Sequence, residues 1–104
     1  MHIDKLIEQA VKALPHITSE EKAQGFLNTL DVSDQMAIIS AYYIGIKHLG
    51  DNALLPDTDP FNRTLHAPVH TSNYADILYK KRLAFRDSMN AFLRCTSQEQ
   101  RDNF

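Results

Sequence analysis

The sequence predicts an all-α protein: a small four-helix bundle with a long ordered loop between the third and fourth helices. Apolar residues recur at helical spacing in four separate segments. Capping residues precede three of these segments, and proline or glycine follows two of them. With 104 residues, of which 43% are hydrophobic and 23% charged, the chain is long enough for one domain with one modest core.

The first two helices are expected over about residues 3–14 and 19–30. One apolar stripe runs through the first segment, and Pro15 ends it because proline cannot continue a helix. In the second segment, Thr18 and Glu21 have the spacing of a capping box. Gly25 weakens its interior by up to about 1 kcal/mol relative to alanine, so we expect the least stable helix here.

The third helix is expected over residues 33–49, capped by Asp31 or Ser33 and followed by Gly50 in a left-handed conformation. Apolar residues from 36 to 46 cover almost its whole circumference, which is typical of a helix surrounded by others. We therefore place this helix at the centre. Its β-branched residues leave a strand as the alternative, but its length and end signals favour a helix.

Gly45 follows Ala41 by four residues, so these small residues share one face of the third helix. A neighbouring backbone is expected to come close there.

The fourth helix is expected over residues 73–94, after Thr71 or Ser72 as cap, and the polar tail 96–104 is expected to fray. Residues 51–72 contain three prolines and cannot form one long helix. A connection of this length is uncommon in a small domain and is usually functional or mobile. Its five large apolar side chains indicate that it packs along the bundle.

Composition excludes several classes of protein. The net charge is −2, without the basic excess typical of nucleic-acid binding. The single cysteine, Cys95, excludes an internal disulfide. No apolar run approaches the roughly 20 residues of a membrane span, and Asp4 and Glu8 interrupt any signal peptide. We expect a reducing, cytoplasmic location and no membrane partner.

Protein–protein interaction is the function that these residues favour. Four short helices leave part of the central apolar helix to be covered, and aromatic residues and arginine commonly anchor interfaces. A homodimer is the simplest way to cover such a surface. The residues assigned to this predicted surface are Tyr42, Tyr43, Phe61, Arg63 and His66.

Nucleic-acid binding is the first alternative. It would use four basic residues of the last helix, Lys80, Lys81, Arg82 and Arg86. At 100° per residue these cations spread around the helix, with Asp76 and Asp87 among them, so a solvated face is favoured over a binding stripe.

Metal-dependent catalysis is the second alternative. His66 and His70 have the i, i+4 spacing of two ligands on one helix face, but Pro68 lies between them and argues against that helix. Cys95 lies near a helix end with no catalytic motif around it, so a packing role is favoured. No phosphate-binding glycine loop is present, and we expect no cofactor.

The stretch Leu-Asn-Thr-Leu-Asp-Val-Ser-Asp at residues 27–34, continued by the apolar residues up to Gly45, resembles a family of small uncharacterised bacterial proteins. That family has a capped helix with an L-V-A-L-x-W-x-G-R-G core, followed by a helix that opens with an aromatic residue. The resemblance covers about half of the chain, at residues 27–45 and 74–92. Tyr43 stands where tryptophan is usual, Ile46 stands where arginine is usual, and the loop differs. The resemblance implies a bacterial, helical, non-secreted protein and no particular activity.

The sequence therefore predicts a non-catalytic protein-interaction or regulatory module. A nucleic-acid-associated protein and a metal-dependent enzyme are the two alternatives.

Overall fold

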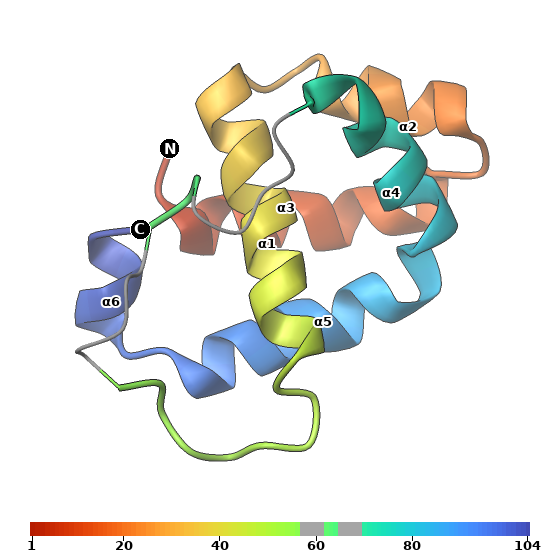
Figure 1. Cartoon of the computed structure of the whole chain (residues 1–104). Helices are drawn as coiled ribbons and strands as arrows, with labels where there is room; N and C mark the ends of the chain where they lie inside the picture. Colours follow the sequence, from red (N-terminus) through yellow and green to blue (C-terminus); the bar gives the residue numbers. More distant parts are fainter. Residues whose placement is uncertain (57–61, 65–69) are drawn as a thin grey trace.

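Apolar stripes and capping side chains divide the chain into short helices that pack across one another. The computed structural model describes residues 1–56, 62–64 and 70–104, and these ranges contain α-helices and no strand (Figure 1). The all-α prediction is confirmed. Short 3-10 turns occupy Leu14–His16 and Thr71–Asn73. The α-helices are α1 (Ile3–Ala13), α2 (Glu20–Leu27), α3 (Val32–Ile46), α4 (Tyr74–Lys80), α5 (Arg82–Cys95) and α6 (Gln98–Asp102).

α3 is the central helix, as its sequence predicts. Nine of its 15 residues are buried. α5 crosses one side of it, while α1 and α4 contact it elsewhere (Figure 1). Its N-cap is Asp31, whose Oδ1 accepts a hydrogen bond from the Asp34 backbone N–H at 2.8 Å. The alternative of a strand over residues 36–46 is excluded.

α3 and α5 approach most closely at Gly45. A Cβ atom built on Gly45 would overlap the backbone carbonyl of Ser88, so only glycine fits at this crossing. The Ser88 side chain is buried, and within the described residues its hydroxyl has no hydrogen-bond partner. The expected close backbone approach is therefore present, and α5 is the helix that makes it.

The first two helices end earlier than the sequence indicates. The α1 helix tightens into the 3-10 turn at Leu14–His16, where Pro15 has no N–H for the next helical bond. The α2 helix begins after Ser19, not Thr18, because Ser19 Oγ accepts from the Lys22 N–H at 3.2 Å. It ends at Leu27, where the Gln35 amide donates to the Leu27 and Leu30 carbonyls at 2.8 and 3.1 Å.

The third helix also ends earlier than residue 49. Beyond Ile46 the chain continues in short turns. In the first of them the His48 N–H donates a hydrogen bond to the Gly45 carbonyl at 3.0 Å. Within the described residues no glycine has a positive φ, so the left-handed conformation expected of Gly50 is wrong. The Arg94 guanidinium instead satisfies the Leu49 carbonyl at 2.9 Å.

The predicted fourth helix is broken in two at Lys81, whose φ of −101° and ψ of 9° depart from helical values. The Arg82 guanidinium donates to the Tyr79 carbonyl at 2.6 Å, which satisfies an acceptor in the last turn of α4. The break changes the chain direction, so that α4 packs against α2 and α5 against α3 (Figure 1).

The prediction that the tail 96–104 frays is wrong. Residues 98–102 form α6, which opens with a capping box between Ser97 and Gln100. Arg101 Nε donates to Asp4 Oδ1 at 2.9 Å and so holds α6 against the start of α1. The Phe104 ring packs on Phe92 with centroids 5.2 Å apart and is 7% exposed.

No helix in the described ranges combines the length and the apolar character needed to cross a bilayer.

We predict opposite effects of alanine at two helical glycines. Gly45→Ala should lower the free energy of unfolding by about 1–3 kcal/mol, because the new methyl group overlaps the Ser88 backbone. Gly25→Ala should raise it by about 0.5–1 kcal/mol, because a Cβ there meets nothing within 4 Å and alanine favours the helix. Urea unfolding followed by circular dichroism measures both. Equal effects of the two substitutions would contradict a tight crossing at Gly45.

Candidate protein-binding face

The two tyrosines assigned to a protein-binding surface lie at the crossing of α3 and α5. Tyr42 is 4% exposed, and its ring stacks on Phe85 with centroids 4.8 Å apart and an interplanar angle of 11°. Burial raises the pKa of the Tyr42 phenol, which keeps it neutral. Tyr43 is half-buried and meets Tyr42 edge-on at 5.3 Å. Tyr42 thus serves the packing of the core, and Tyr43 keeps partial access to solvent.

Arg63, assigned to the same surface, forms an internal clamp that joins three parts of the chain. Its Nη1 donates to Asp34 Oδ1 at 2.9 Å and to Ser33 Oγ at 3.2 Å. Its Nε and Nη2 donate to the Phe104 and Met1 carbonyls, each at 3.0 Å. The Met1 amino group shares Asp34 Oδ1 at 3.0 Å. Arg63 therefore ties the loop to the start of α3 and to both ends of the chain.

Phe61 and His66, the remaining members of that predicted surface, lie outside the described residues. The pair His66 and His70 therefore stays a prediction, and of the two only His70 is described, as an exposed residue. In the described ranges, no three His, Cys, Asp or Glu side chains gather in a way that could hold a metal ion.

Cys95 is buried at the end of α5. Burial raises the pKa of its thiol, so at neutral pH the reactive thiolate is scarce. Its Sγ lies 3.6 Å from the Phe92 carbonyl, to which it donates. These properties are those of a packing residue, which agrees with the role that its sequence context favours.

The four cations of the alternative nucleic-acid surface lie on α4, on α5 and at the break between them, and have different surroundings. Lys80 pairs with Asp76 at 3.1 Å along α4. The Arg82 guanidinium lies over the Tyr79 ring, 4.2 Å from its centroid. Lys81 and Arg86 are exposed. The break at Lys81 separates these side chains further, so they form no continuous basic stripe.

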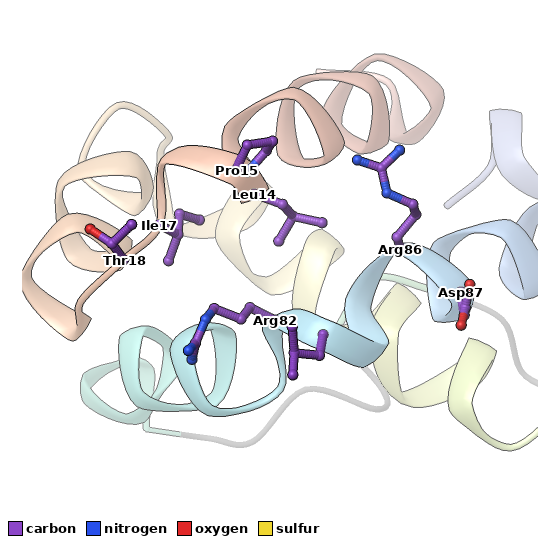
Figure 2. A pocket seen from close by; sticks show the side chains of 8 residues that line it. Leu14, Pro15, Ile17, Thr18, Arg82, Arg86 and Asp87 are labelled. Carbon is purple, nitrogen blue, oxygen red and sulfur yellow. The ribbon is translucent and has the colours of Figure 1, made fainter.

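One surface combines exposed apolar area with charge. We call it the Leu83 face. It is a groove of 460 Å³ between the 14–18 segment and the first turns of α5 (Figure 2). Figure 2 shows Arg86 extending toward α1 and Arg82 turned the other way along the groove. The apolar residues of the first side are Leu14, Pro15 and Ile17, beside Thr18, and α5 contributes Arg82, Leu83, Arg86 and Asp87.

Leu83 is the most exposed large apolar residue in the described ranges, with 88% of its surface open to solvent. It lies nine residues before Phe92, and at about 100° per residue the two side chains point to opposite sides of α5. Because Phe92 faces the core, Leu83 must face away from it. This position can be read from the sequence, as an apolar residue off the stripe of the fourth predicted segment, and the sequence reasoning missed it.

The Arg86 side chain is exposed and, within the described residues, forms no ion pair. Its charge is therefore available to a partner, whereas Arg82 is committed to Tyr79. A groove with one apolar side, a projecting leucine and a free guanidinium group can bind an apolar side chain next to a carboxylate.

No known protein family, curated protein or solved structure matches this chain. The resemblance of residues 27–45 to a family of small bacterial proteins stays a prediction.

We predict that Arg63→Ala lowers the free energy of unfolding by about 2–4 kcal/mol. The substitution removes the hydrogen bonds to both chain ends and leaves Asp34, whose side chain is 8% exposed, with the Met1 amino group alone. Lys12→Ala is the control, because the Lys12–Glu8 pair at 3.1 Å lies on the exposed surface of α1 and should matter little. Urea unfolding compares the two variants. A small loss in both would show that the clamp does not hold the chain ends.

Proposed function

We propose that this protein is a non-catalytic interaction module that binds another protein chain through the Leu83 face. The observation that carries the proposal is the 88% exposure of Leu83 beside an apolar groove. A leucine at the centre of an interface contributes by excluding water from its neighbours, and arginine is enriched among the residues that anchor interfaces. Arg86 supplies such a side chain next to Leu83.

The internal roles of Tyr42 and Arg63 support the choice of this face. Both side chains are occupied by contacts within the chain, one with Phe85 and one with the chain ends. Leu83 and Arg86, both exposed on α5, have no such role within the described residues, and Leu83 contributes almost nothing to the core. A binding surface built on these two residues therefore uses side chains that folding does not require.

Nucleic acid is the alternative partner. Lys81 and Arg86 are exposed and could contact phosphates. The groove favours protein, because four of its eight lining residues are apolar and Asp87 is among the others, where a carboxylate opposes a phosphate backbone.

We predict that Leu83→Ser reduces capture of partner chains by roughly tenfold, the loss expected from removing one central anchor worth about 1.4 kcal/mol. A tagged copy is expressed in the native host, cross-linked and purified, and the captured chains are quantified by mass spectrometry. A second copy carrying a different tag is included, so that self-association is counted.

Leu54→Ser is the matched control, because Leu54 is 61% exposed and lies outside the Leu83 face. Both substitutions affect exposed side chains and should leave the thermal midpoint almost unchanged. Equal capture by wild type and Leu83→Ser would contradict the proposal. Capture that nuclease treatment abolishes would assign the face to nucleic acid instead.

A further inference from the structure

We propose that the partner of the Leu83 face is a second copy of this chain. In the pair, related by a two-fold axis near residues 16–19, the Leu83 face of each copy contacts the α2 surface of the other. This inference rests on the proposed function and names the occupant of the same face. Three observations support it: a complementary hollow on α2, its place beside the Leu83 face, and the charges of the two surfaces.

The hollow on α2 includes Gly25, which has no side chain. A Cβ atom built on Gly25 meets nothing within 4 Å, so the helix surface there is open to a neighbour. The space has a volume of 600 Å³. We call it the Gly25 hollow. It is lined by Glu20, Glu21, Gln24, Gly25 and Asn28 of α2 and by Ala75 of α4.

The Gly25 hollow and the Leu83 face meet at one corner of the molecule. The Leu83 face includes residues up to Thr18. A second open space shares Glu21 and Gly25 with the Gly25 hollow and extends from there to His16 and Ser19. Both surfaces thus adjoin the turn that leads from α1 into α2. A two-fold axis through this turn would bring the Leu83 face of one copy opposite the Gly25 hollow of the other, and the reverse contact follows by symmetry.

The charges of the two surfaces are opposite. Arg82, Arg86 and Asp87 give the Leu83 face a formal charge of +1. Glu20 and Glu21 give the Gly25 hollow a formal charge of −2, and Lys22 lines the adjoining space toward Ser19.

Within the described residues, Glu20, Glu21 and Arg86 form no ion pairs of their own. Crossed pairing therefore places free carboxylates opposite a free guanidinium group. Pairing the Leu83 face with itself would instead join two surfaces that each carry a formal charge of +1, which electrostatic repulsion disfavours.

Crossed pairing also gives Leu83 a place to be buried. Its side chain projects from α5, and the missing side chain at Gly25 provides a recess on the opposite copy. Since the axis doubles every contact, two leucines are covered and the assembly closes as a dimer. The interface is small and largely polar, so its affinity is modest and falls with salt.

Sedimentation equilibrium tests the inference on the full chain from about 1 µM to about 1 mM, the range suited to a small polar interface. We expect a monomer–dimer equilibrium that weakens at least tenfold between about 0.05 M and about 0.5 M salt. Leu83→Glu should abolish the dimer, whereas Leu54→Glu, which changes an exposed leucine outside both surfaces, should preserve it.

A charge exchange identifies the pairing. Arg86→Glu places carboxylates opposite Glu21, and Glu21→Arg places guanidinium groups opposite Arg86, so each variant alone should be monomeric. Mixing the two should restore a dimer with one copy of each, because both contacts then join opposite charges. Circular dichroism and thermal midpoints show that each variant is folded, as expected for exposed positions.

Three results would overturn the inference. A wild-type chain that stays monomeric up to 1 mM excludes the dimer, while a Leu83-dependent capture of another protein would still support the proposed function. If the Leu83→Glu variant still dimerises, the interface lies elsewhere, and the proposal that the Leu83 face forms it is wrong. A mixture of the charge-exchange variants that stays monomeric, or grows into polymers larger than a dimer, excludes the two-fold pairing.

Discussion

The close approach of α3 and α5 at Gly45 and Ser88 is the constraint on which the rest of the structure depends. Two helix backbones can come this near only where one has no side chain. The contact fixes the rotation of α5 about its axis, and Tyr42 then stacks on Phe85 within the core. Once Phe85 and Phe92 face α3, the opposite side of α5 must face solvent, and Leu83 lies on that side.

The ends of the chain depend on a different kind of contact. Apolar burial contributes through Phe104, but the direction in which the ends run is fixed by charged hydrogen bonds from Arg63 and Arg101. Each guanidinium group donates to backbone carbonyls, Arg63 to those of Met1 and Phe104 and Arg101 to that of Thr96. These arginines serve the fold as hydrogen-bond donors, whereas Arg86 remains available at the surface.

The sequence predicts well what depends on local pattern. The apolar circumference of residues 36–46 places α3 at the centre, and Asp31 caps it as its spacing indicates. Individual side-chain contacts are what the pattern cannot show. The Gln35 amide donates to the Leu27 carbonyl at the end of α2, the Arg82 guanidinium donates to the Tyr79 carbonyl beside the break at Lys81, and Arg101 holds the tail through the Asp4 carboxylate. In each case a long polar side chain selects its own acceptor, and periodicity carries no information about that choice.

The same distinction applies to the candidate site. Aromatic residues are common interface anchors, but an aromatic ring on a central helix also fills the core well. Tyr42 has this second role, since its ring is buried in the core. An exposed leucine by itself is ordinary, since much of any protein surface is apolar. Two neighbouring features distinguish Leu83 from an ordinary exposed leucine. One is the groove beside it, to which a turn more than 60 residues earlier in the chain contributes, and the other is the free charge of Arg86. Folding brings these parts together and leaves Leu83 and Arg86 exposed, so both side chains are open to a partner.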